Sequence, residues 1–193
     1  MPILGVVASQ ISGHLISPYS PTGSYDALAV YTVPSGGASS ITFAGIPQSG
    51  YQHLQLRVLT RSDRSAANSN IYMGFNGDTT TGNYYGHYLS GDGTSAGAGA
   101  KIGSTTAAAI ISAADTSTAN VFTGAVIDIL DYTNTNKNKV FRSLNGYDTN
   151  GDGRIFFMSG LWINTNAINS IQITDALGNF KQNSQFALYG IRG

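Results

Sequence analysis

The sequence predicts an all-β protein: a two-sheet antiparallel sandwich, jelly-roll-like, with an extended N-terminal arm. Three observations lead to this prediction. Residues that favour helices on protein surfaces are scarce, and the chain contains no glutamate at all. Short runs alternate apolar and polar residues with the period of two that half-buried strands show. Clusters rich in Gly and Asn, which suit tight turns, separate those runs.

The segment 53–61 shows the alternation most clearly. Leu54, Leu56 and Val58 fall on one face of the expected strand, and polar neighbours fall on the other. About ten such strands fit one domain of 193 residues. The expected strands cover residues 27–33, 40–43, 53–61, 71–75, 84–89, 121–132, 140–144, 155–163, 170–174 and 186–191.

The beginning of the chain does not show this alternation of apolar and polar residues. Ser and Gly interrupt its apolar residues, and Pro18 and Pro21 oppose regular structure. Residues 1–24 are therefore expected to form an extended docking arm, and residues 25–193 the sandwich. The apolar opening lacks the basic start and the long apolar run of an export signal. The aliphatic side chains of the arm are expected to bind a partner: Ile3, Leu4, Val6, Val7, Ile11, Leu15 and Ile16.

Two further segments lack a clear alternation. Residues 94–120 are rich in Ala, Gly, Ser and Thr, which predicts a long inter-strand loop with one weak strand at 107–111. Its small side chains would allow close packing against a neighbour. Residues 164–169 are polar and are expected to form a connection with one helical turn.

The composition excludes several classes of function. Charged residues make up 10% of the chain and the formal net charge is zero, which argues against nucleic acid and anionic membranes as partners. The absence of cysteine removes thiol catalysis, disulfides and thiolate metal sites. No stretch approaches the roughly 20 apolar residues that cross a bilayer. No cofactor is expected.

One segment matches half of a calcium-binding loop. Asp148, Asn150 and Asp152 place oxygen atoms at alternate positions before Gly153, but position twelve is Ser159 where such loops carry a bidentate Glu. The pattern favours an Asx-rich hairpin turn and leaves calcium binding at 148–153 open.

Catalytic patterns are incomplete. Gly93 to Gly97 spells a nucleophile elbow around Ser95, but no helix is expected after it. Asp128 and Asp131 lie three apart in an expected strand and hence on opposite faces, which does not suit a glycosidase pair. The three histidines, His14, His53 and His87, share no metal-binding spacing. No catalytic or metal-ligating residue is assigned.

Two groups of side chains suit recognition instead. Arg57, Arg61 and Arg64 form the densest basic patch, and even spacing puts Arg57 and Arg61 on one strand face, either solvated or paired with carboxylates of a partner. The tyrosines could stack on sugars or anchor a protein interface. Alternation predicts that one side of this aromatic group is core and favours packing for the other large aromatics. The aromatic residues concerned are Tyr72, Phe75, Tyr84, Tyr85 and Tyr88, with Tyr51, Tyr147 and Trp162.

Several short sequence motifs along the chain are similar to those of a known group of proteins. They are MPILG at residues 1–5, ITFAGIP at 41–47, YQHLQLR at 51–57, FNGD at 75–78, YGHYL at 85–89, DILDYTNTNK at 128–137, SGLW at 159–162 and FALYGI at 186–191. Together they resemble small virion structural proteins of tailed bacteriophages, particularly phages of aquatic bacteria and cyanobacteria. That group contains capsid decoration proteins and tail-fibre modules, and the resemblance carries no catalytic residues.

The resemblance implies a non-enzymatic virion protein. An apolar arm without a coiled-coil or repeat region favours a capsid decoration, or cement, protein. Such a protein would be made in the host bacterial cytoplasm and bind the major capsid protein on the outer capsid surface, as a homotrimer. The alternative is a tail-fibre module that binds a receptor or glycan through the tyrosines. A polysaccharide-cleaving enzyme is ranked last.

Overall fold

Each of the ten strands expected from the alternation overlaps a strand of the computed structural model, which describes residues 24–149 and 151–193. The strands are β1 (Tyr25–Thr32), β2 (Ser40–Ala44), β3 (His53–Thr60), β4 (Asn68–Phe75), β5 (Tyr84–Gly91), β6 (Ala96–Ser104), β7 (Ala107–Ala113), β8 (Thr123–Leu130), β9 (Lys139–Asp148), β10 (Gly153–Trp162), β11 (Ser170–Asp175) and β12 (Gln185–Ile191). They form two antiparallel sheets, as predicted. Over the described part of the chain, no helix is long and apolar enough to span a membrane.

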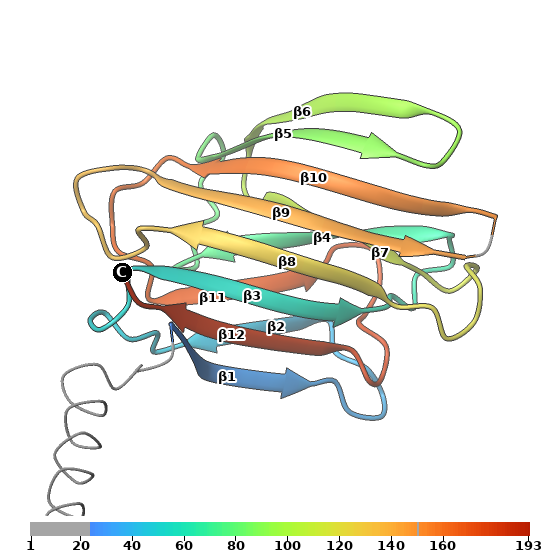
Figure 1. Ribbon diagram of the computed structural model, residues 1–193, viewed down its shortest axis with the longest axis horizontal. Helices are drawn as coiled ribbons and strands as arrows, with labels where there is room; N and C mark the ends of the chain where they lie inside the picture. The colour runs from blue at the N-terminus through green and yellow to red at the C-terminus, as the bar shows by residue number, and fades with distance from the viewer. Residues whose placement is uncertain (1–23, 150) are drawn as a thin grey trace, which may run out of the picture.

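Eight of these strands follow a jelly-roll order. In the larger sheet β1, β12, β3 and β8 are neighbours, and β2, β11, β4 and β7 make up the smaller sheet. Along these eight strands the chain changes sheet at every step except from β4 to β7, which pair within the smaller sheet, and this is the arrangement of a jelly roll. The hairpins β5–β6 and β9–β10 are inserted into this order and extend the larger sheet to eight strands. Figure 1 shows the larger sheet in front of the smaller one, with β5 and β6 at its upper margin.

The prediction that residues 94–120 form a loop is wrong for most of the first half of that range. Residues 96–104 form β6, which pairs with β5 from Tyr84 to Gly91. Ala and Gly have low strand propensity, so the alternation of apolar and polar side chains could not reveal this strand; its backbone ladder with β5 holds it. The weak strand expected at 107–111 is confirmed as part of β7. Residues 164–169 contain no helical turn.

The core lies between the two sheets and is densest around a group of aromatic rings. The ring centroids of Phe75 and Trp162 are 5.5 Å apart, and Tyr84 stacks on both at 6.3 Å. Trp162 is fully buried, which confirms its predicted packing role. The ring of Phe141 packs directly on the backbone of Gly160, where a Cβ atom would lie 1.9 Å from the ring.

We predict that Gly160→Ala lowers the free energy of unfolding by about 1–3 kcal/mol, because the added methyl group must displace the Phe141 ring. The matched control is Gly124→Ala in β8, where nothing lies within 4 Å of the new Cβ atom. It should leave stability unchanged or raise it slightly, since alanine restricts the unfolded chain. Urea unfolding of both variants measures the difference, and equal losses would contradict the close packing at Gly160.

Asp78 joins the core to the connection before β5. Its Oδ2 accepts hydrogen bonds from Trp162 Nε1 at 2.7 Å and Asn83 Nδ2 at 2.8 Å, and Thr80 N donates to its Oδ1 at 2.9 Å. Burial by itself would raise the pKa of this carboxyl, but the hydrogen bonds from Asn83, Trp162 and Thr80 outweigh it and hold the pKa well below 3.8. Asp78 therefore stabilises the fold as a carboxylate.

A depressed pKa in the folded state fixes the direction of the pH dependence. The stabilisation by Asp78 is complete above the pKa of the unfolded chain and is lost as the pH falls through the lower, folded-state value. We expect Asp78→Asn to be less stable than the native chain from about pH 5 upward, with the gap closing as the pH falls below about 4. Urea unfolding across this range measures it; a constant gap would show that the charge is not responsible.

Candidate protein-binding surface

The larger sheet has a face that the smaller sheet does not cover, here named the outer face. Alternation along each strand sends every second side chain into the core and the others to this outer face. Many of those outward side chains are apolar and between 40% and 64% exposed. They are Val30 of β1, Leu59 of β3, Val126 of β8, Val140 and Leu144 of β9, Ile155 and Phe157 of β10, and Leu89 of β5.

The strand register aligns these side chains into a continuous row, here named the central row. Directly opposed residues of neighbouring strands lie about 4.5–5.5 Å apart, so the row is one contiguous band across all eight strands. Its only charged member is an arginine. In order from β1 to β6 the row consists of Val30, Ala187, Arg57, Val126, Leu144, Phe157, Leu89 and Ala98.

A hollow of about 850 Å³ lies beside the central row. Gly124 of β8 and Gly146 of β9 are directly paired and leave its floor without side chains. Leu59 and Ile155 continue the same cross-strand line on either side of the two glycines, and the central row forms the wall along it. A second hollow of about 510 Å³ lies over β10, β5 and β6, where Ala98 and Ala100 are small. The outer face is therefore apolar along the central row and hollowed at two places, whereas the next outward row is polar and consists of Gln55, Asp128, Arg142, Ser159 and His87.

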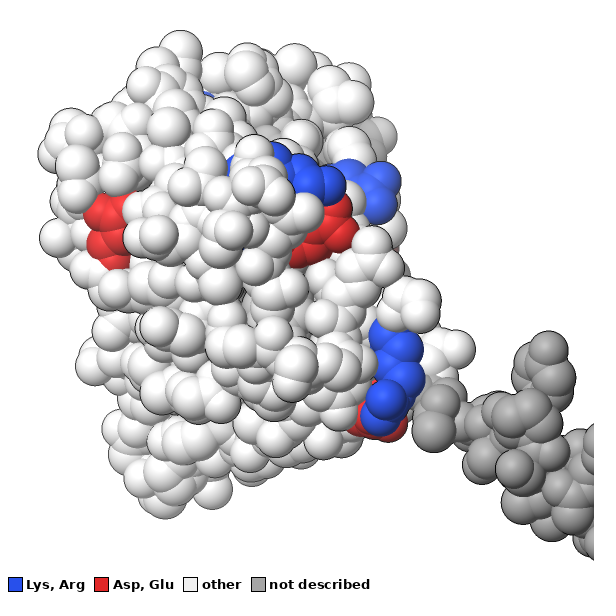
Figure 2. All heavy atoms as spheres, turned by 90° about the vertical axis from the view of Figure 1, so that its left-hand side faces the viewer, with Lys and Arg blue, Asp and Glu red and all other residues white. Residues whose placement is uncertain are grey.

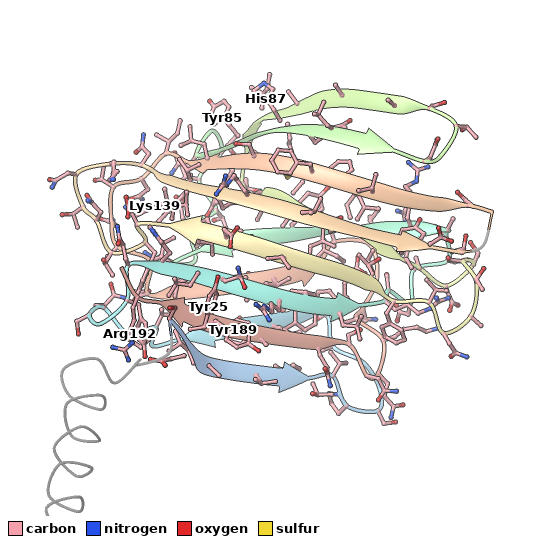
Figure 3. All side chains as sticks on the ribbon, in the orientation of Figure 1. Tyr25, Tyr85, His87, Lys139, Tyr189 and Arg192 are labelled. Atoms are coloured by element: carbon pink, nitrogen blue, oxygen red, sulfur yellow. The ribbon has the colours of Figure 1, made fainter. Side chains whose placement is uncertain are left out.

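Arg57 is held in place within this apolar face. Its Nε donates to Gln55 Oε1 at 3.0 Å, and Gln55 Nε2 donates to Asp128 Oδ1 at 2.8 Å. The guanidinium lies 5.4 Å from the ring centroid of Tyr189 and 5.8 Å from that of Tyr25; Figure 3 shows both tyrosines on the β1–β12 side of the sheet. Arg57 belongs to none of the ion pairs among the described residues. Arg57 is therefore a positioned cation on the outer face, and its predicted role in binding a partner stays a prediction.

The other two arginines of the predicted patch lie elsewhere. Arg61 was expected to share a face with Arg57, and this is wrong, because β3 ends at Thr60 and Arg61 forms a bridge with Ala113. Arg61 is only 4% exposed. Its Nη1 donates to the carbonyl oxygens of Thr118 and Val121 at 2.8 and 2.7 Å, and its Nη2 to that of Ser117 at 3.0 Å. Arg61 holds the connection before β8 together.

Arg64 is half-buried and its Nη1 donates to Asn68 O at 3.0 Å. Arg57 is thus the member of the basic patch that the outer face presents. The aliphatic residues of the predicted arm, from Ile3 to Ile16, lie outside the described residues, as does His14.

The tyrosine cluster divides between the two faces, as alternation predicts. Tyr84 is fully buried, its hydroxyl accepts a hydrogen bond from Phe75 N at 2.9 Å, and burial raises its pKa to about 12. Tyr88 stacks on Phe156 with ring centroids 4.6 Å apart. Tyr85 is half-buried and shares the outer face with His87, as Figure 3 shows near the top of the sheet. Tyr84 is a core residue and presents no ring to a sugar, whereas Tyr88 is partly buried and packs against the core.

The acidic side chains have structural partners. Asp131 follows β8 with a φ of 47°, and hydrogen bonds from Lys137 and Gln52 lower its pKa. Asp92 accepts from Ser95 N at 2.7 Å in the β5–β6 turn, so the residues around Ser95 form a hairpin turn and no nucleophile elbow. Thr149 N donates to Asp152 O at 2.7 Å in the β9–β10 turn. Among residues 24–149 and 151–193, no group of three or more His or Asp side chains could hold a metal ion.

Sequence reasoning missed the apolar outer face. A signal was present: the run Ile155, Phe156, Phe157, Met158 is apolar at every position, whereas a strand with one solvated face alternates. Such a run in an antiparallel sheet indicates that both faces take part in packing. Charges are rare on the surface as well: Figure 2 shows one end of the sandwich as almost entirely uncharged, with a few small clusters of opposite sign.

Comparisons with known proteins add little. No family model matches the sequence, and no curated protein matches it significantly. Among solved structures, the chain is similar to a legume lectin-like domain from Entamoeba histolytica, with 12% identity, coverage of 88% of this chain and 90% of that chain, and a TM-score of 0.30. A similarity of this extent says nothing about what this chain binds, and the relationship to phage virion proteins stays a prediction.

We predict a large loss of stability for substitution of Arg61, which directly follows β3, and a small one for substitution of Arg57 within β3. Arg61→Leu should lower the free energy of unfolding by about 3 kcal/mol, because it leaves three carbonyl oxygens without their donor. Arg57→Leu should change it by about 1 kcal/mol or less, since its contacts are at the surface. Urea unfolding separates the two; a large loss for Arg57→Leu would mean that this side chain serves the fold.

Proposed function

We propose that the chain is a non-enzymatic structural protein of a tailed-phage virion, a capsid decoration protein that binds the major capsid protein through its outer face. The observation that carries the proposal is the central row, an apolar band across eight strands with Arg57 as its one charge. Contiguous exposed apolar surface of this kind marks protein interaction sites. The jelly-roll fold is one that capsid proteins use, and the sequence phrases point to the same class.

The dimensions of the outer face suit a protein interface. Eight strands at a spacing of about 4.8 Å are about 34 Å across, and strands of seven to ten residues at about 3.3 Å each are about 23–33 Å long. That area is on the order of 800–1,100 Å², comparable to the contribution of one partner to a standard protein interface. Apolar side chains at the centre with a single arginine between tyrosines match the composition of interface centres.

Binding of this kind needs no chemistry at the site. A protein that binds only the assembled shell stabilises it by mass action, by about 2.7 kcal/mol per site when its free concentration is a hundredfold above Kd. Three linked copies in the proposed homotrimer would add avidity. The described carboxylates support this role rather than catalysis, because Asp78, Asp92 and Asp131 are engaged in turns and connections.

The test is attachment of the purified protein to phage particles stripped of it, measured by co-sedimentation. The double variant Leu89→Asp with Phe157→Asp places two charges in the part of the central row that lines the second hollow, over β10 and β5, and we expect it to weaken attachment about 100-fold or more, since burying an unpaired carboxylate is costly. The matched control, Leu177→Asp, changes a leucine that is 60% exposed in the β11–β12 connection and should attach normally.

Two results would overturn this assignment. Native protein that does not attach to the stripped particles, or that immunogold labelling finds only on tails, excludes a decoration role. Specific binding on a glycan array that survives the double variant would favour the receptor-binding alternative, for which the half-buried Tyr85 is the member of the cluster on the outer face.

A further inference from the structure

The hollow on the outer face needs an apolar occupant. Its lining contains the aliphatic side chains of Leu59, Val126, Leu144 and Ile155, and its floor is backbone at Gly124 and Gly146. An open floor of this kind admits another chain close to the sheet. We expect the native occupant to bring apolar side chains to these four residues, because polar groups placed against them would lose water without gaining partners, while Arg57 at the rim of the same hollow can donate to acceptors of the occupant.

The same chain contains a segment with the matching chemistry. Residues 1–23 hold seven Ile, Leu and Val residues and no Asp, Glu, Lys or Arg. A segment with that composition gains from burial against an apolar surface and brings no carboxylate or ammonium group that the hollow would have to desolvate. Its backbone carbonyl groups can also accept hydrogen bonds from Arg57, whose Nη atoms face no carboxylate among the described ion pairs.

The described chain begins at one end of the larger sheet. Arg192 N donates to Ser24 O at 3.1 Å, so the ladder between β1 and β12 continues to Ser24. Ser24 lies at the end of the sheet where the C-terminus also lies (Figure 1), and β1 runs from there along the sheet. To reach the hollow of its own sheet the chain would have to reverse direction. A neighbouring copy beyond the sheet end requires no reversal.

The length of the segment is sufficient for such a contact. Twenty-three extended residues span up to about 76 Å, whereas the whole sheet is about 34 Å wide at a strand spacing of about 4.8 Å. Residues 1–23 can therefore leave one copy and cross the hollow of the next.

We infer that residues 1–23 of one copy lie in the hollow of a second copy of this chain. The inference rests on the proposed role of the outer face as a protein-binding surface and names one of its occupants. The segment would fill the hollow and leave the remainder of the outer face, including the β10–β5–β6 side, to the shell. Because the contact joins two different surfaces, it is heterologous, and a ring of three copies would give the predicted homotrimer if the rotation between copies closes.

The experiment uses two full-length variants with complementary defects. The arm variant carries Val7→Asp and Ile16→Asp, and the hollow variant carries Leu144→Asp and Ile155→Asp, two side chains that are 54% and 59% exposed. Sedimentation velocity measures their assembly. We expect the native chain and the control Leu177→Asp to form a closed oligomer, and each double variant alone to be monomeric at concentrations at least tenfold above the native dissociation constant.

Mixing the two variants identifies the contact. The hollow variant retains a native arm and the arm variant retains a native hollow, so the mixture should form a 1:1 heterodimer that cannot grow further. A monomeric native chain overturns the inference. An oligomer that the arm variant still forms shows that the outer faces pack directly on each other, and variants that stay monomeric when mixed show that the arm does not dock in the hollow of another copy.

These outcomes separate the inference from the proposed function. A monomeric native chain that attaches to stripped particles retains the decoration role and loses the arm exchange. An oligomer that forms the mixed heterodimer but does not attach to particles retains the arm exchange and loses the decoration role. Unchanged circular dichroism and urea midpoints of both double variants exclude loss of fold as the cause.

Discussion

The structure depends on the alternation of side chains along each strand, combined with the unequal size of the two sheets, which have eight and four strands. Every strand of the larger sheet must point half of its side chains to each face, and the smaller sheet covers only one of those faces. On the covered side this produces the aromatic core around Trp162. On the other side it produces a second apolar layer that no strand of residues 24–149 and 151–193 covers. The same backbone ladders that align the core residues across the sheet align Val126, Leu144 and Phe157 into a band.

Charged groups in this protein are used sparingly and often hold connections rather than face solvent. Lys139 is almost completely buried, and its Nζ donates to the carbonyl oxygens of Asn134, Lys137 and Thr165. Arg61 does the same for the connection before β8. Asp175 is buried too and accepts from the hydroxyls of Ser62 and Ser69 and from Leu177 N. Because these charged side chains bind groups within the protein, they are not available on the surface. In the central row of the outer face, Arg57 is the one charged side chain.

The fold was predictable where side-chain chemistry carried the signal. Alternation found β3 and its buried residues because Leu54 and Leu56 differ sharply from their neighbours. It failed for β6, whose Ala and Gly side chains have no strong preference for either face, and it misplaced Arg61 because nothing in the sequence marks where β3 leaves the sheet. The site required knowledge that no local pattern contains: which outward side chains of eight distant segments stand opposite one another.

The two inserted hairpins, β5–β6 and β9–β10, allow the width of the larger sheet to change without any change in the eight jelly-roll strands. Each hairpin enters and leaves at a connection between strands of the jelly roll; β9–β10 pairs with β8, and β5–β6 pairs with β10 at the margin of the same sheet. Removing or lengthening β5–β6 would narrow or broaden the outer face while the eight jelly-roll strands keep their order. A chain of this fold can therefore change the width of its outer face by gaining or losing a whole hairpin, without any redesign of the interior.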